Sequence, residues 1–453
     1  MRLIGFLLLA AALLTAIAWV RAPEYDEAYT IFLTAGHARP AWPHGVFTAG
    51  SVRYFYTGHA GFAQIAHDLR TGDVHPPLYF WVLKIWRGVA GPSWFAARLL
   101  SVFCSLAGLS LLARLAIAAD IPVYPALFLT LLSYGFAYTG IVARGFALAQ
   151  LCNIAGVLLI FLAARRNNWR LALAGGAAFG AACFTNYLAV FTACAAVAWL
   201  LPARPRLLAA ALAGFLPFLP VCAWFFLAQR QSRIGQFTAF SPPHAVALLA
   251  KDSGAALFGG LPLYAGYFGP PVTLALAALF TACLVFVCRR RHVFAPLFAT
   301  LALAPPCGLL TLGFMFGNTP IEIRYLAFSL PFFSLLLAPA LPRPLLGTML
   351  AVQGAAIFGL AFCAATMQPQ AAAARAAAAF PGALVLLPFG NDGVGIPGPF
   401  IAAAPDAMRI LLLHPGAVPR VHAVIVTLTA DNESRALAVE TGCPLGAAIC
   451  SPH

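Results

Sequence analysis

Apolar stretches long enough to cross a bilayer recur along the whole of this 453-residue chain. A transmembrane helix needs roughly 20 consecutive apolar residues, and about eleven stretches approach that length. They are residues 3–20, 94–117, 121–140, 146–164, 171–185, 187–201, 207–227, 271–288, 293–316, 325–341 and 345–365. Because 62% of the residues are hydrophobic and only 9% are charged, a soluble fold is excluded for most of the chain. We therefore predict an all-α polytopic membrane protein.

Basic residues lie in short clusters between these stretches, so the net charge of +14 indicates membrane topology and not nucleic-acid binding. If Arg2 lies inside the cell, the positive-inside rule is met by arginines that fall on the same side: Arg114, Arg165, Arg166, Arg204, Arg206, Arg289, Arg290, Arg291 and Arg343. Residues 21–93, residues 229–270 and the C-terminal tail then face outward. Abundant alanine, proline and arginine are typical of GC-rich bacterial genomes, so we predict a multi-pass protein of the inner (plasma) membrane.

The segment from His75 to Arg87 is apolar but too short to span the membrane. Its Lys84 and Arg87 are three residues apart and share one helical face. One charge at the bilayer centre costs roughly 2.5–3.5 kcal/mol, so a second would make insertion worse. We predict an interfacial helix that lies flat on the membrane, and a second short amphipathic helix over residues 59–70.

Two neighbouring acids, Asp26 and Glu27, follow the first apolar stretch directly and precede a short predicted helix over residues 28–35. The positive end of a helix dipole favours carboxylates there. The simpler interpretation is a helix cap at the membrane surface. The functional interpretation is a carboxylate pair at the membrane–water boundary that acts as general base on a hydroxyl.

Three arginines lie at the outward ends of predicted spans, on the same side as Asp26: Arg98, Arg144 and Arg324. A single arginine at such a position often only extends its side chain to the lipid headgroups. Three of them beside a carboxylate indicate a site for an anionic lipid headgroup, because guanidinium groups match phosphate bidentately.

The order of these motifs resembles the GT-C glycosyltransferase superfamily, in the branch of protein O-mannosyltransferases and aminoarabinose transferases. The resemblance covers roughly residues 1–367. It rests on Asp26-Glu27, His75-Pro76-Pro77-Leu78-Tyr79, Ala97-Arg98-Leu99-Leu100-Ser101, residues 138–147 and Ile323-Arg324-Tyr325, in that order.

The resemblance implies a GT-C fold with interfacial juxtamembrane helices and an enzyme that uses a polyprenyl-phosphate-linked sugar as donor on its outward face. The family's aspartate matching Asp26 acts as the base or positions it. The segment matching His75-Pro76-Pro77 lies beside the donor phosphate, which arginines matching Arg144 and Arg324 bind. This chain has His75 where the aminoarabinose transferases carry a lysine.

A mechanism follows from this chemistry, because polyprenyl phosphate leaves readily only if its developing charge is stabilised. Arg144, Arg324, Arg98 and either His75 or Lys84 are the candidate phosphate-binding groups. Asp26 would deprotonate an acceptor hydroxyl, which gives inversion at the anomeric carbon. Glu27 would orient the acceptor or join Asp26 on a divalent cation, although the sequence shows no dedicated metal site and no other cofactor. Sugar and acceptor (glycan, lipid or protein) remain open.

We place a domain boundary between residues 366 and 367. The tail alternates short apolar runs with turn residues, and it predicts strands over residues 384–387, 408–413 and 421–428 and a helix over 434–440. These elements indicate a small C-terminal α/β domain outside the membrane. Residues 390–395 resemble a phosphate loop only superficially and are interpreted as a turn. Cys443 and Cys450 can pair if the tail is outside the cytoplasm.

A polytopic transporter or lipid flippase of the cell envelope is the alternative function. Such proteins carry ionisable residues near the membrane midplane and broken helices in matched repeats. Here the charges gather at outer helix ends, which favours chemistry at the membrane surface. A non-catalytic scaffold of envelope assembly is a third possibility.

Overall fold

The computed structural model describes residues 3–37, 40–201, 204–233, 237–290, 292–363, 367–419, 423–428, 431–444, 446 and 449–450. Arg2 and Arg291, which contribute to the topology prediction, lie outside the described residues. The chain forms two compact units. The helical unit comprises residues 1–18, 66–79 and 99–360, and the sheet-containing unit comprises residues 19–65, 80–98 and 361–453.

Seven stretches of helix in the described part of the chain are long and apolar enough to cross a membrane. They are α1 (Leu3–Val20), α5 (Trp94–Ala118), α8 (Phe146–Arg166), α11 (Pro205–Phe215) with α12 (Leu219–Ala228), α15 (Gly269–Arg289), α16 (Ala295–Phe316) and α19 (Arg343–Phe362). Each coincides with one of the predicted spans. The prediction of a mostly helical chain with several candidate membrane spans is therefore confirmed.

The other four predicted spans form shorter or interrupted helices. They correspond to α6 (Val123–Leu131) with α7 (Tyr134–Ile141), α9 (Trp169–Cys183), α10 (Val190–Ala198), and α17 (Ile323–Leu326) with α18 (Leu330–Leu337). Between α6 and α7, Ser133 adopts an extended backbone and its Oγ donates to the carbonyl of Thr130 at 2.7 Å. Such local hydrogen bonds compete with helix continuation. The count of eleven spans stays a prediction.

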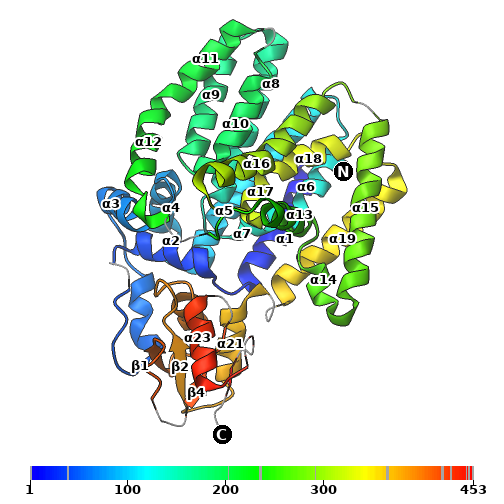
Figure 1. Cartoon of the computed structure of the whole chain (residues 1–453). Coiled ribbons are helices and arrows are strands. Elements are labelled where there is room, and N and C mark those ends of the chain that lie inside the picture. Colours follow the sequence, from blue (N-terminus) through cyan, green and yellow to red (C-terminus); the bar gives the residue numbers. More distant parts are fainter. Residues whose placement is uncertain are drawn as a thin grey trace. The chain divides into compact units, whose positions relative to one another are not determined.

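Small residues let α8, α9 and α11 lie side by side in the helical unit, as Figure 1 shows. A Cβ added to Gly176 of α9 would lie 1.8 Å from the carbonyl oxygen of Ala211, and one added to Gly214 of α11 would lie 2.0 Å from that of Leu173. The two helix backbones are therefore in direct contact. Such close packing at small residues is common between membrane helices, because lipid provides no hydrophobic driving force for their association.

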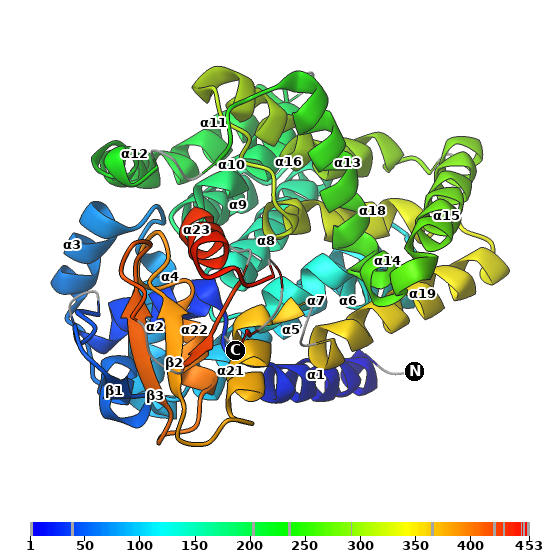
Figure 2. The same cartoon turned by 60° about the horizontal axis from the view of Figure 1, so that its bottom comes forward.

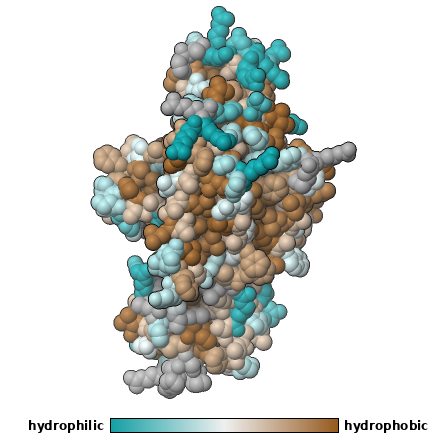
Figure 3. Space-filling model, turned by 90° about the vertical axis from the view of Figure 1, so that its right-hand side faces the viewer, coloured by the Kyte–Doolittle hydropathy of each residue, from teal (hydrophilic) through white to brown (hydrophobic). Residues whose placement is uncertain are grey.

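Other helices of this unit expose apolar side chains. Figure 3 shows hydrophobic residues over much of the face on which α15 and α19 lie. Leu274 of α15 is 73% exposed and Phe358 of α19 is 64% exposed. Apolar side chains so open to the surroundings are typical of helices that face lipid. The connection between α12 and α15 contributes α13 (Pro242–Phe258) and α14 (Leu261–Tyr264).

The first predicted outward loop contains α2 (Tyr25–Ala35), the 3-10 helix η1 (Gly50–Tyr56), α3 (Phe62–Gly72) and α4 (Leu78–Ala90). Three of these agree with the predicted short helices, shifted by a few residues. Helix α2 begins three residues before its predicted start, because a capping box forms at Glu24.

The sheet has the order β1-β3-β2-β4, with β2 (Leu384–Pro388), β3 (Arg409–Leu413) and β4 (Ala423–Ile425) from the tail. Strand β2 runs parallel to both β3 and β4, as Figure 2 helps to follow. The edge strand β1 (Phe47–Thr48) comes from the first loop and pairs antiparallel with β3. The predicted strands over 384–387 and 408–413 are confirmed, whereas residues 421 and 422 of the third lie outside the described residues.

The tail also forms α21 (Pro369–Ala377), α22 (Pro397–Ala403) and α23 (Asn432–Thr441), the last of which confirms the predicted helix. Because β1 completes their sheet, the tail strands belong to one compact unit with residues 19–65 and 80–98. This grouping differs from the sequence-based division at residues 366 and 367, and a separately folded C-terminal domain stays a prediction.

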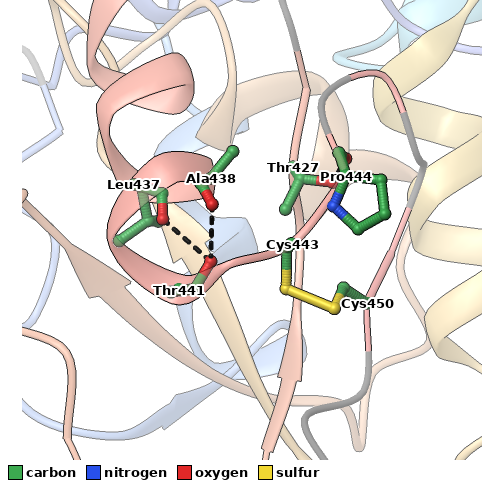
Figure 4. Close-up of a disulfide and its surroundings, with 7 residues drawn as sticks. All are labelled: Thr427, Leu437, Ala438, Thr441, Cys443, Pro444 and Cys450. Atoms are coloured by element: carbon green, nitrogen blue, oxygen red, sulfur yellow. Dashed lines mark hydrogen bonds between the residues drawn. A yellow bond between two sulfur atoms is a disulfide. The ribbon is translucent and has the colours of Figure 1, made fainter.

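A disulfide joins Cys443 and Cys450, as Figure 4 shows. Cys443 is buried in a small apolar cluster with Leu386, Leu413 and Ile425. The backbone of Cys450 bridges to Ile425 through two hydrogen bonds of 2.7 Å. The disulfide therefore fixes the segment after α23 against β4.

Candidate active site

Glu27 lies in the first turn of α2, and its carboxylate has several hydrogen-bond partners. Its Oε2 accepts the backbone N–H of Glu24 at 3.2 Å, which completes the capping box. Its two oxygens also accept from Arg98, from Nε at 2.7 Å and from Nη2 at 2.5 Å. The residue is fully buried. Glu27 therefore takes part in a helix cap, and the same side chain forms a bidentate ion pair. Its predicted catalytic role stays a prediction.

Arg98, at the start of α5, donates further to the backbone carbonyls of Arg21 and Ala22, the latter at 2.8 Å. Arg21 in turn forms an ion pair with Glu24 at 2.6 Å. Arg98 is 3% exposed, so its guanidinium is surrounded by these acceptors. The arrangement anchors the beginning of α2 to α5, and the predicted binding of phosphate by Arg98 stays a prediction.

Asp26 lies in the first turn of the same helix, one residue before Glu27, and is 5% exposed. Its backbone carbonyl accepts from Thr30 Oγ1 at 3.0 Å. The first turn of α2 carries the positive end of the helix dipole, which stabilises the charged carboxylate. The sequence placed Asp26 correctly at a helix start next to a membrane span.

Arg87 holds the other end of α2. Its guanidinium donates to the hydroxyl of Thr34 at 2.6 Å, to the carbonyl of Ile31 at 3.3 Å and to the carbonyl of Tyr56 at 2.7 Å. Arg87 is 1% exposed, so its guanidinium is buried among these acceptors. The predicted position of its helix at the membrane interface stays a prediction. The spacing of Lys84 and Arg87 placed both residues on one helical face. It could not show that the end of α2 offers backbone carbonyl groups to Arg87.

Lys84 lies on α4 with its Nζ 4.5 Å from the centre of the Phe62 ring. This is a cation–π contact, typically worth about 0.5–1 kcal/mol at an exposed site. Trp81, on the same helix, donates from Nε1 to the carbonyl of Phe62 at 3.2 Å. Both contacts attach α4 to the start of α3. The predicted phosphate-binding role of Lys84 stays a prediction.

Residues 390–395, here called the Asp392 loop, contact α2 directly. Oδ2 of Asp392 accepts from the hydroxyls of Tyr25 and Tyr29, at 2.8 and 2.9 Å. Its Oδ1 accepts the N–H groups of Val394 and Gly395, at 2.7 and 2.9 Å. A Cβ on Gly395 would lie 1.9 Å from the Tyr25 ring, so only glycine permits this approach. The sequence correctly indicated a turn here but not its contact with the helix of Asp26.

The helical unit contains a second cluster, formed by Asp73, His75 and Arg144. Oδ1 of Asp73 lies 2.7 Å from Nδ1 of His75, and its Oδ2 accepts from Nη2 of Arg144 at 3.2 Å. Arg144 Nη2 also lies 3.0 Å from Nδ1 of His75. Burial alone would raise the pKa of the Asp73 carboxyl, but Arg144 and His75 outweigh it and hold that pKa well below its usual value.

Sequence reasoning predicted His75 and Arg144 but missed Asp73, which joins them. The signal available was an acid two residues before the candidate histidine. Asp73 also accepts the N–H groups of Val74 and His75, at 2.6 and 3.0 Å. An aspartate that accepts the N–H groups of the next two residues stabilises a turn. In that turn its carboxylate lies close to the side chain two positions later.

Three neighbouring contacts fix this turn. Gln229 donates from Nε2 to the carbonyls of Leu69 and His75, at 3.0 and 2.8 Å. The hydroxyl of Tyr187 donates to Gln229 Oε1 at 2.9 Å. A Cβ on Gly145 would lie 3.1 Å from Thr185 and 3.3 Å from Cβ of Tyr79, so the residue after Arg144 has little room for a side chain. The cluster is therefore held by buried polar contacts.

Arg324 lies in the same unit, at the start of α17. It forms an ion pair with Glu322, and its guanidinium carbon lies 5.3 Å from the centre of the Tyr325 ring. The Tyr325 ring is 6.2 Å from that of Phe146, which is 6.5 Å from the ring of His75. Two aromatic rings thus connect Arg324 to the Asp73 cluster, and the predicted grouping of His75, Arg144 and Arg324 lies in one region of the helical unit.

The predicted site residues are divided between the two units. The sheet-containing unit holds Asp26, Glu27, Lys84 and Arg98. The helical unit holds His75, Arg144 and Arg324. Within the described ranges, no group of three or more His, Cys, Asp or Glu side chains is placed to hold a metal ion. Glu27, the predicted second metal ligand, is paired with Arg98.

Two solved structures of ArnT, an aminoarabinose transferase from Cupriavidus metallidurans, are similar to this chain. The apo structure is 15% identical in sequence, with 97% of this chain and 89% of that chain covered and a TM-score of 0.50. The structure bound to undecaprenyl phosphate is 15% identical, with 96% and 87% covered and a TM-score of 0.51. The chain has the ArnT fold. The fold that the resemblance implies therefore agrees with that of a solved aminoarabinose transferase.

Arabinosyltransferase EmbB from Mycobacterium smegmatis matches with a TM-score of 0.40 at 16% identity, over 83% of this chain and 32% of that chain. The comparison therefore rests on ArnT. No family model matches the sequence, and no curated protein sequence matches it.

Proposed function

We propose that this protein is an integral membrane glycosyltransferase. It transfers a sugar from a polyprenyl-phosphate-linked donor to an acceptor hydroxyl at the outer face of the membrane, with inversion at the anomeric carbon. The observation that carries the proposal is the similarity, over 96% of the chain, to ArnT bound to undecaprenyl phosphate. Asp26 is proposed to activate the acceptor, and the basic residues beside Asp73 are proposed to bind the donor phosphate.

Asp26 is assigned as the general base. A base must be held in a fixed position, because small displacements of a catalytic group reduce the rate steeply. Helix α2 meets this requirement, since Arg98 anchors its first turn and Arg87 its last. The carboxylate of Glu27 is engaged by Arg98 and the helix cap. The family resemblance assigns the base to the position of Asp26.

Arg144, His75 and Arg324 are assigned to the donor phosphate. Guanidinium groups bind phosphate through paired N–H donors, and their charge stabilises the leaving group as it forms. Asp73 orients Arg144 and His75 toward one another, which keeps two donors together before the substrate binds. Lys84 and Arg98 are assigned to helix anchoring, with phosphate contact as their secondary role.

One displacement completes the reaction. The acceptor oxygen forms a bond to the anomeric carbon while the bond from that carbon to the phosphate oxygen breaks. The hydroxyl proton goes to Asp26, and the bonding electrons leave with polyprenyl phosphate. The acceptor attacks from the side opposite the leaving group, so the product has the opposite anomeric configuration.

The test uses the purified full chain with a panel of labelled polyprenyl-phosphate-linked hexoses, pentoses and amino sugars. We expect release of polyprenyl phosphate with at least one donor, and loss of that release in Asp26→Asn. Asp120→Asn is the matched control, because Asp120 is exposed and its left-handed backbone (φ 58°) is one that asparagine tolerates. Full activity of Asp26→Asn would remove the assigned base.

Absence of release with every donor would argue against the enzyme. Movement of an intact lipid-linked sugar across liposomes without release would favour the flippase. A donor that is active in the assay also identifies the sugar, and the anomeric configuration of its product, measured by NMR, tests inversion directly.

A further inference from the structure

The helical unit has a groove between α5 and α8, at the end of α8 opposite Arg144. Its volume is about 780 Å³, within the range of ligand-binding cavities. Arg114 of α5 lines it together with Arg165 and Arg166, the last two residues of α8. Helix α8 has 21 residues and begins two positions after Arg144, so Arg165 and Arg166 lie about 30 Å along the helix from the start of α8. The groove is a separate feature of the helical unit.

The charge of the groove is entirely positive. Arg114, Arg165 and Arg166 are exposed, and no carboxylate is present among the described residues that line it. Arg165 is held over the groove because its Nη1 donates to the backbone carbonyl of Ala118, at the end of α5. Three guanidinium groups that converge without a counter-charge repel one another, and a bound anion removes that repulsion.

The remaining walls are apolar. Seven of the ten lining residues carry hydrocarbon side chains, among them Leu111, Leu158 and Leu162. Both helices belong to the seven candidate spans, so this part of the groove faces the hydrocarbon region of a membrane. A small soluble anion would leave these walls uncovered, whereas a lipid brings a phosphate and an acyl chain together.

We propose that this groove binds an anionic phospholipid. Its phosphate contacts the three arginines, and one acyl chain lies along the apolar walls between α5 and α8. Guanidinium groups pair bidentately with phosphate, and basic pockets between membrane helices select anionic headgroups. The proposal gives Arg114, Arg165 and Arg166 a specific ligand in addition to their role in topology.

Native mass spectrometry of the full chain in detergent tests the proposal. The probes are phosphatidylglycerol and phosphatidylcholine with identical acyl chains. We expect phosphatidylglycerol to bind about tenfold more tightly, and the triple variant Arg114→Gln, Arg165→Gln, Arg166→Gln to lose that preference. The matched control removes three other arginines, with Arg204→Gln, Arg206→Gln and Arg343→Gln, and should keep it. Retention of the preference by the first variant, or its equal loss in the control, would overturn the proposal.

Two further arms keep the result interpretable. Leu162→Trp fills the apolar part of the groove while it keeps all three arginines, so it should weaken phosphatidylglycerol binding even if the triple variant folds poorly. Glycerol 3-phosphate at millimolar concentration should not displace the lipid. Displacement of the lipid by glycerol 3-phosphate would indicate a site for a soluble anion. Stronger binding of undecaprenyl phosphate than of phosphatidylglycerol would indicate a site for the donor lipid. A dimer that the triple variant abolishes would indicate that a second copy of the chain occupies the groove. Each of these results contradicts the proposal.

Discussion

Asp392 accepts a hydrogen bond of 2.9 Å from the hydroxyl of Tyr29, across 363 residues of sequence. The same carboxylate oxygen accepts from Tyr25, so one side chain of the tail binds two tyrosines of α2. Asp26 lies between these two tyrosines in the sequence. Because residues three and four apart share one face of a helix, the two hydrogen bonds fix the rotation of α2 about its axis and hence the direction of Asp26.

Asp392→Ala should therefore reduce turnover without abolishing expression. A displacement of about 1 Å at a catalytic group costs up to about 100-fold in rate, and we expect kcat to fall by about tenfold or more with little change in the donor KM. Steady-state kinetics with the active donor measure this. Asp406→Ala is the control, since Asp406 is 79% exposed and pairs with Arg53 in the same unit. A change of KM alone would mean that the Asp392 loop acts on substrate binding and not on Asp26.

Glu27→Gln should strongly destabilise the sheet-containing unit. Removing one partner of a buried ion pair leaves the other charge unpaired, at a cost of about 3–5 kcal/mol. Thermal unfolding of the purified protein, followed by the fluorescence of a thiol probe or of tryptophan, measures the loss. In the double variant Glu27→Gln, Arg98→Met the unpaired charge is gone, so part of the stability should return. If the double variant is as unstable as the sum of both single variants, the pair is not coupled.

Asp73→Asn should lower stability and weaken donor binding at neutral pH. The folded pKa of Asp73 is lowered below its unfolded value of about 3.9, so its contribution is fully present above pH 4 and is lost as the pH falls below that value. The difference in melting temperature between wild type and Asp73→Asn should therefore shrink as the pH falls below 4. A difference that stays the same between pH 5 and pH 3 would contradict the assigned pairing.

Asp252 shows the opposite pH dependence. It lies on α13, outside the seven candidate spans, where burial and then Glu322 raise its pKa to about 6, with Lys251 opposing them. A folded pKa above the unfolded value means that stability is lost as the pH rises from about 4 through 6. Asp252→Asn should consequently raise the melting temperature at pH 7.5 and have no effect at pH 4. A stabilisation that is equal at both values would point to a cause other than ionisation.

The sequence predicted the parts of the fold that depend on local pattern. The candidate spans, the start of α2 near Asp26 and the strands β2 and β3 all follow from runs of apolar residues and their boundaries. The two-residue strand β1 could not be predicted, because it exists only through its pairing with β3, more than 360 positions later. Short strands draw their stability from such partners and not from their own residues.

The candidate site could be predicted only in part, because contacts between distant segments complete it. His75 and Arg144 were recognised by residue type and motif order. Asp73 contacts Arg144 only because the fold brings together two segments that four helices, α4 to α7, separate in the sequence. The spacing of Lys84 and Arg87 alone does not show that the end of α2 lies beside Arg87. Charge pairing between distant segments is information that a single sequence does not contain.

The antiparallel pairing of Phe47 with Ile410 ties an early segment to a late one. During synthesis, β1 emerges hundreds of residues before the strand that it joins, so its sheet cannot close until nearly the whole polypeptide has been made. A prematurely terminated product would keep its membrane helices yet lack the partner of Tyr25 and Tyr29. Under the proposed mechanism, incomplete molecules would thus be inserted into the membrane but remain inactive, and catalytic competence would arise only as the last step of biogenesis.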